Sequence, residues 1–88
     1  MPFRVCEIQT TPNPNATKFV VDREVAPQPM SFFNASAAAE HPLASRLFEI
    51  PGVTSVLLLG DFITVNKRPE VDWKQISVMV QKILESSP

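Results

Sequence analysis

Cysteine, glycine and histidine are scarce in this sequence, which has one cysteine, two glycines and one histidine among 88 residues. Cys6 has no partner for an internal disulfide, and a chain without disulfides fits a reducing compartment. No glycine-rich phosphate-binding loop is present, and Cys6 and His41 do not show the spacing of metal ligands. We therefore expect neither a bound cofactor nor an enzymatic centre.

The sequence also lacks a bias of charge and a long hydrophobic run. Its net charge is −1 and its pI about 5.7, and its eight Lys and Arg residues are scattered along the chain, whereas a nucleic-acid binder has a basic cluster. The longest apolar run, Val56 to Leu59, is far too short to span a bilayer. Residues 1–7 lack the apolar stretch of a signal peptide. These absences predict a cytoplasmic protein that binds neither nucleic acid nor a membrane.

Apolar residues and proline are, in contrast, well represented. Apolar residues make up 44% of the chain, enough for one core in a single domain that covers residues 1–88. A chain of this length buries about two-thirds of its unfolded surface, so it can fold without a metal or a disulfide. Nine prolines against two glycines indicate stiff, shaped loops.

The segment Thr11-Pro12-Asn13-Pro14-Asn15 is the stiffest of these loops. Each of its prolines fixes φ and keeps the preceding residue out of the helical region, and its asparagines can bond nearby backbone. We expect a rigid, exposed connection between two strands. One interpretation is that this loop sets the register of the two strands, and the other is that it recognises a partner. The two roles are compatible.

Four segments carry the alternation and the β-branched or aromatic side chains that are typical of strands, namely residues 3–10, 17–21, 53–59 and 62–67. Residues 53–59 become apolar on both faces, which predicts a central strand that is covered on both sides. Gly60 and Asp61 form a turn signal before the last strand. Residues 30–33 are a candidate short edge strand, and residues 22–29 are expected to be a loop.

Three helices are expected. Asn34 is a candidate N-cap for a short helix over residues 35–40, and Pro42 suits the first turn of a second helix that ends before Pro51 and Gly52. Asp72 is the candidate N-cap of a third helix. This helix has an apolar stripe that we assign to the core: Trp73, Ile76, Met79, Val80, Ile83 and Leu84. The alternative for Trp73 is a lid on the core at the start of the helix.

The element order β-β-(β)-α-α-β-β-α predicts an α+β fold. Strands that precede and follow a helical segment favour a mainly antiparallel sheet of about four strands with helices packed on one face.

Three polar residues are candidates for a structural or a functional role, namely Cys6, His41 and Asp61. Cys6 is predicted to be a small buried hydrophobe, because no basic neighbour or second cysteine activates it. His41 is predicted to serve the start of a helix or the surface. A nucleophile–base pair of Cys6 with His41 is the enzymatic alternative. Asp61 has a role in its turn, and its carboxylate is a candidate contact for a partner.

Several motifs taken together resemble one known family. The motif of residues 11–15, followed by Lys18 and Phe19, resembles the N-terminal domain of the Nfu/NifU-type iron–sulfur scaffold proteins. Further segments match this domain in order, namely residues 36–39, 42–44, 47–48, 52–53, 55–56, 61–65 and 72–73. The resemblance spans nearly the whole chain.

The resemblance implies an association with iron–sulfur cluster assembly or delivery. Full Nfu proteins carry a second domain with a Cys-x-x-Cys motif, which this sequence lacks, and a cluster needs several thiolate ligands, usually about four. The expected role is therefore a non-enzymatic interaction domain without cluster ligands of its own. The expected partners are iron–sulfur assembly factors, target apoproteins or a separate Cys-x-x-Cys Nfu-type domain. The alternative is a generic regulatory protein-binding module outside this process.

The candidate partner-binding residues come from the loop motif and the hairpin motif: Thr11, Pro12, Asn13, Pro14, Asn15, Lys18, Asp61 and Phe62.

Overall fold

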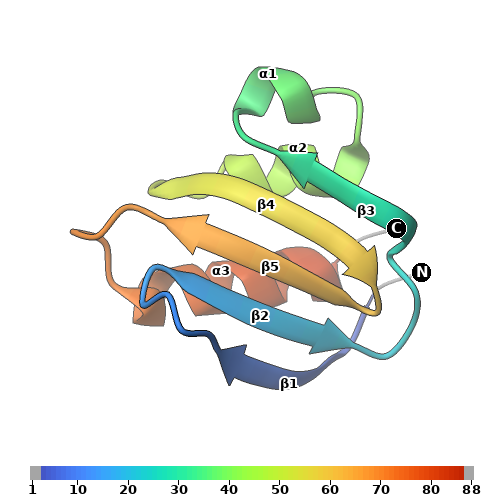
Figure 1. Ribbon diagram of the computed structural model, residues 1–88, viewed down its shortest axis with the longest axis horizontal. Coiled ribbons are helices and arrows are strands. Elements are labelled where there is room, and N and C mark those ends of the chain that lie inside the picture. Colours follow the sequence, from blue (N-terminus) through green and yellow to red (C-terminus); the bar gives the residue numbers. More distant parts are fainter. Residues whose placement is uncertain (1–2, 87–88) are drawn as a thin grey trace.

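Helices cover one face of a sheet in this protein and leave the other face bare (Figure 1). The computed structural model describes residues 3–86, and over that range the chain forms five strands and three helices. In chain order these are β1 (Val5–Thr10), β2 (Ala16–Val21), β3 (Ala26–Phe32), α1 (Ala35–Ala38), α2 (Pro42–Phe48), β4 (Val53–Gly60), β5 (Phe62–Lys67) and α3 (Trp73–Glu85). In Figure 1, α2 and α3 lie behind the sheet, and α1 contacts α2 and β3.

The sheet has the strand order β1-β2-β5-β4-β3, and every neighbouring pair is antiparallel. The α+β fold, with an antiparallel sheet and helices, is confirmed. The expected number of about four strands is wrong, because the third strand is a full member of the sheet and makes five. The first and third strands in the chain form the two edges.

The third strand begins at Ala26, inside the segment that was expected to be a loop, and ends at Phe32. Residues 26–29 were expected to be a loop because they contain Pro27 and Pro29, and proline cannot donate to a β-ladder. Prolines are tolerated on edge strands, and the register of β3 against β4 shifts between Ala26 and Met30, across both prolines. Phe33 lies outside the strand and is 74% exposed.

The predicted helix caps are in place. Asn34 Oδ1 accepts from the backbone N–H of Ala37 at 2.7 Å, and Asp72 Oδ1 accepts from Lys74 N–H at 2.9 Å. The first helix is shorter than expected and ends at Ala38. His41 caps the second helix, because its Nδ1 accepts from Ala44 N–H at 3.2 Å, which confirms its expected place at a helix start.

The core lies between the sheet and the helices. One face of each inner strand supplies it, including Phe19 of β2, Ile63 of β5 and Leu58 of β4, each fully buried. The third helix adds Ile76, Val80 and Leu84 to the same cluster. Met79 was expected in this core, but it is 42% exposed, because the stripe on α3 is wider than the surface that the sheet can cover.

The fourth strand has two different faces. It lies between β5 and β3, so its central position is confirmed. Val56 and Leu58 face the helices and are buried, whereas Leu57 and Leu59 are only partly buried on the bare face. The expectation that this strand is covered on both sides is therefore wrong.

The first strand is anchored to the end of the second. Arg4 N–H donates to Asp22 Oδ1 at 3.1 Å, and Asp22 N–H donates to the Arg4 carbonyl at 3.0 Å. The Arg4 N–H lowers the pKa of the Asp22 carboxyl, and the neighbouring Arg23 guanidinium acts in the same direction. Because the pKa is lowered by folding, this anchor is present at neutral pH and weakens as the pH falls through the folded pKa.

Adjacent residues of β4 offer a direct test of the one-sided core. Leu58→Ala should destabilise the domain by about 2–5 kcal/mol, because it leaves a cavity between sheet and helices. Leu57→Ala is the matched control and should destabilise by about 1 kcal/mol, since that side chain lies on the bare face. Urea unfolding followed by circular dichroism measures both. Equal losses for the two variants would contradict a core on one side only.

Candidate partner-binding loop and open sheet face

The loop of residues 11–15, here called the Pro/Asn loop, is held by its own hydrogen bonds. The Thr11 hydroxyl lies 2.9 Å from the carbonyl oxygens of Asn13 and Ala16 and accepts from Asn13 N–H at 3.2 Å. Asn13 Oδ1 accepts from Asn15 N–H at 2.9 Å, and the Asn13 carbonyl accepts from Ala16 N–H at 3.0 Å. The exposed residues Pro12, Asn13 and Pro14 form its tip. The polar side chains therefore shape the loop from within.

Two residues far away in the chain fasten this loop to the body of the domain. Trp73, the first residue of α3, donates from Nε1 to the Pro14 carbonyl at 2.9 Å, across 59 positions in sequence. Lys67, at the end of β5, donates from its backbone N–H to the Asn15 carbonyl at 2.9 Å and from Nζ to Asn15 Oδ1 at 3.3 Å. The Lys67 ammonium also lies 5.5 Å from the centre of the Trp73 ring. A strand end and a helix start thus hold one side of the loop.

The sequence gives no indication that Trp73 and Lys67 hold the loop. The sequence predicts Trp73 to be part of the core or a lid on it, and it predicts Lys67 only as the end of a strand. Neither residue has a recognisable spacing to the loop, because β5 and the start of α3 reach it only through the fold. Lys67 is 8% exposed, and its N–H and Nζ donate to three oxygen atoms, namely both the carbonyl and Oδ1 of Asn15 and the carbonyl of Arg68. A buried lysine that ends a strand gives no signal in the sequence.

Lys18 and Phe62 lie apart from the loop, on the bare face of the sheet, which we call the open face. The Lys18 ammonium lies 4.1 Å from the centre of the Phe62 ring, a cation–π contact. Phe62 stands in a cross-strand row with Val20 on one side and Leu59 on the other. Leu57 stands in the next row, which also contains Lys18. The open face is therefore a partly apolar surface with a cation over its largest ring.

Asp61 lies at the opposite end of the sheet from the Pro/Asn loop, as the turn between β4 and β5 in Figure 1 shows. Its carbonyl accepts from Val21 N–H, at the far end of β2, at 2.8 Å. The six residues of β2 separate the two ends by roughly 17 Å at about 3.4 Å per residue. The candidate residues are thus divided among the loop, the open face and the far turn, and they do not form one site.

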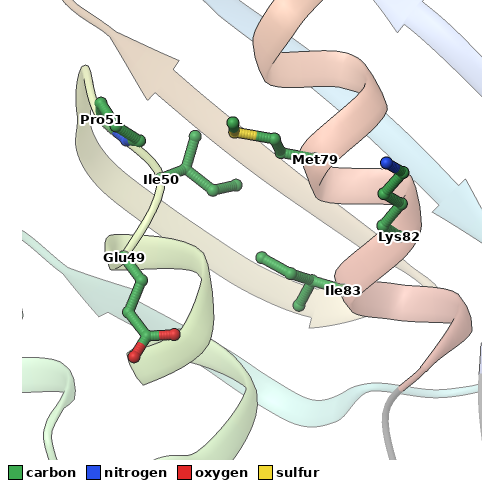
Figure 2. A pocket seen from close by; sticks show the side chains of 6 residues that line it. All are labelled: Glu49, Ile50, Pro51, Met79, Lys82 and Ile83. Carbon is green, nitrogen blue, oxygen red and sulfur yellow. The ribbon is translucent and has the colours of Figure 1, made fainter.

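A groove lies on the helical side of the molecule, where the sequence predicted only core. Ile50 and Pro51, between α2 and β4, face Met79 and Ile83 of α3 across a space of about 280 Å³ (Figure 2). Glu49 and Lys82 contribute the charged side chains of its lining. Met79 thus lines a surface groove, contrary to the prediction that it is a core residue.

The alternative pairing of Cys6 with His41 is not present. Cys6 is exposed, so the prediction of a buried thiol is wrong. It lies on an edge strand, at the register shift between Val5 and Glu7, where no neighbouring element covers it. The His41 ring packs 5.5 Å from the Phe32 ring of β3, at the other edge of the sheet. Four strand spacings of about 4.8 Å separate these edges.

No group of three or more His, Cys, Asp and Glu side chains that could hold a metal ion occurs among residues 3–86. In the same part of the chain, no helix is both long enough and apolar enough to cross a bilayer.

The fold and these surfaces define a small α+β domain that presents a fastened loop and an uncovered sheet face. The family model described as "Scaffold protein Nfu/NifU N terminal" matches residues 6–87. The chain belongs to this Nfu/NifU N-terminal family.

Among curated proteins, the chain is similar to the human mitochondrial "NFU1 iron-sulfur cluster scaffold homolog", with 47% identity over 76 residues, which cover 82% of this chain and 30% of that protein. It is also similar to a NifU-like protein of Schizosaccharomyces pombe, with 34% identity over 88 residues, covering 91% of this chain and 34% of the relative. The chain thus spans about a third of the length of these relatives.

Solved structures share the fold. The solution structure of a NifU-like protein from Saccharomyces cerevisiae has a TM-score of 0.81 and 27% identity, covering 96% of this chain and 76% of that one. The crystal structure of protein SAV1430 from Staphylococcus aureus has a TM-score of 0.79 at 20% identity, over 93% of this chain and 99% of that one, and it supports the fold alone.

The fastening of the loop can be tested with Trp73→Phe, which keeps an aromatic ring and removes the Nε1 donor to Pro14. The unfolding free energy should fall by about 1 kcal/mol, because a carbonyl loses its partner. Amide hydrogen exchange at Asn13, Asn15 and Ala16 should become several-fold faster. Phe62→Leu, on the open face, is the control and should leave these amides unchanged. Unchanged exchange in Trp73→Phe would show that the loop needs no fastening by α3.

Proposed function

We propose that this chain is a non-enzymatic protein-interaction domain that acts in iron–sulfur cluster assembly or delivery and ligates no cluster itself. Membership of the Nfu/NifU N-terminal family supports the link to this process. The single cysteine supports the second part, since clusters are held by several thiolates. Cys6 is the only thiolate that the sequence offers, and it lies on a strand.

The main support for a role in protein interaction is that the Pro/Asn loop is both exposed and held in one conformation. Its tip is exposed, while its backbone is held by internal hydrogen bonds and by Trp73 and Lys67. A loop that is already ordered loses little conformational entropy when a partner binds, so its contacts contribute more fully to affinity. Thr11 and Asn15 shape the loop, and the exposed tip residues Pro12, Asn13 and Pro14 are proposed to touch the partner.

Lys18 and Phe62 are proposed to extend the contact onto the open face. Their cation–π pair holds a positive charge above an aromatic ring. Asp61 is proposed as a contact of its own at the other end of the sheet, because the fold separates it from the loop. A partner that touches all three regions must lie along the length of β2 and β5.

The proposed partners are iron–sulfur assembly factors, target apoproteins or a separate Nfu-type domain with a Cys-x-x-Cys motif. The cytoplasmic location stays a prediction from the sequence, whereas the human relative is named as mitochondrial. If binding screens recover only proteins unrelated to iron–sulfur chemistry, the generic regulatory module becomes the better description.

Cluster binding is tested by anaerobic reconstitution of the purified protein with iron and sulfide. We expect iron and sulfide contents near zero after desalting and no absorbance band of a cluster in the visible range. A Cys-x-x-Cys Nfu-type domain treated in parallel is the positive control. A stoichiometric cluster that is lost in Cys6→Ser would refute the proposal that this domain has no cluster ligands.

The loop is tested with the double substitution Pro12→Ala and Pro14→Ala, measured by calorimetric titration with a Cys-x-x-Cys Nfu-type domain from the same organism. The affinity should fall about tenfold, which corresponds to about 1.4 kcal/mol, because the tip loses both its rings and its stiffness. Pro27→Ala with Pro29→Ala is the matched control, since these two prolines are also exposed but lie on the edge strand β3. Equal losses in both double variants would argue against a specific role of the loop.

A further inference from the structure

We propose that the outer edge of β1 is a further docking surface, which binds an extended segment of a partner protein as a sixth strand of the sheet. The segment that fits this edge alternates apolar and basic side chains. This inference is independent of the role in iron–sulfur chemistry, because it depends on the backbone of an edge strand and on the side chains beside it.

The first strand pairs with β2 alone, and within residues 3–86 no segment pairs with its outer edge. After the register shift between Val5 and Glu7, the four residues from Glu7 to Thr10 pair in regular succession with Val20 to Thr17. Every second residue of such a strand directs its N–H and C=O away from the sheet. These groups are the hydrogen-bonding partners that an added strand requires.

The opposite edge of the sheet, formed by β3, is less suited to accept an added strand. Pro27 and Pro29 of β3 carry no backbone N–H, and the pairing of this strand is irregular between Ala26 and Met30. Prolines and irregular pairing are devices that prevent further strands from adding to a sheet. Of the two edges, β1 is the one whose backbone is suited to accept a strand.

The side chains of β1 indicate which segment would fit. Ile8 pairs with the buried Phe19, so it lies on the helical face, yet it is 45% exposed because it stands at the rim of the sheet. An apolar residue of an added strand would cover it. Glu7 pairs with Val20 and is exposed on the open face, where the neighbouring cation, Lys18, stacks on Phe62. A lysine or arginine of the added strand would lie opposite this carboxylate.

A second copy of this chain is a poorer occupant than a foreign segment. Residues 5–10 contain Glu7 and no basic residue, so two β1 strands paired with their Glu7 residues opposite would bring two carboxylates together, and neither β1 strand supplies a countercharge. Like charges on adjacent strands oppose pairing. The same carboxylate that attracts a basic segment therefore discourages the pairing of two copies.

The experiment uses two blocked six-residue peptides, one alternating valine with lysine and the other alternating valine with glutamate. Amide shifts of the whole protein are followed by NMR during titration. We expect the lysine peptide to bind at least tenfold more tightly than the glutamate peptide, with the largest shifts in residues 7–10. In Glu7→Lys, whose side chain is exposed and supports no contact of the core, the preference should reverse.

Three results would overturn the proposal. The first is that neither peptide binds. The second is that both bind with equal affinity before and after Glu7→Lys, or shift residues of the Met79 groove or the Pro/Asn loop instead of β1. The third is a concentration-dependent dimer in sedimentation that shifts the same β1 amides, which would assign the edge to a second copy. A peptide with N-methylated backbone amides on one edge is the control, and it should lose binding if the added strand forms a ladder.

Discussion

Burial of only one face of the sheet is the constraint on which the rest of this structure depends. The helices α2 and α3 lie against the face that carries Phe19, Leu58 and Ile63, and this contact forms the one core of the described chain. A domain of this size has enough apolar surface for a single core of two layers. The helices therefore leave the other face of the sheet uncovered.

The three candidate binding surfaces, namely the Pro/Asn loop, the open face and the edge of β1, differ in structure. The Pro/Asn loop is rigid because Trp73 and Lys67 hold it against the end of β5, so the same helix that closes the core also supports the loop. The open face carries Phe62 and its neighbours in rows across three strands, and the edge of β1 offers backbone groups. Of the three, only the open face lies away from the helices, since the loop contacts the first residue of α3 and β1 also contacts α3.

Local signals in the sequence predicted the elements well, and relations across the fold were the part they missed. The caps Asn34 and Asp72 were predictable because capping depends on residues within one turn. Met79 and Cys6 were misplaced because their burial depends on how far the sheet extends beneath α3 and on which strand is an edge. The sequence predicts the second half of β3 as a short edge strand, but it predicts residues 22–29 as a loop, because Pro27 and Pro29 cannot donate to a β-ladder.

The kind of most elements, the stiffness expected of residues 11–15 and the family to which the chain belongs follow from the sequence alone. These depend on backbone preferences and on motifs that are contiguous in the chain. The tertiary structure alone decided that the candidate residues form separate surfaces, that Trp73 and Lys67 fasten the loop, and that β1 is a free edge. The physical reason is that these properties arise from contacts between residues up to 59 positions apart, which exist only once the sheet has assembled.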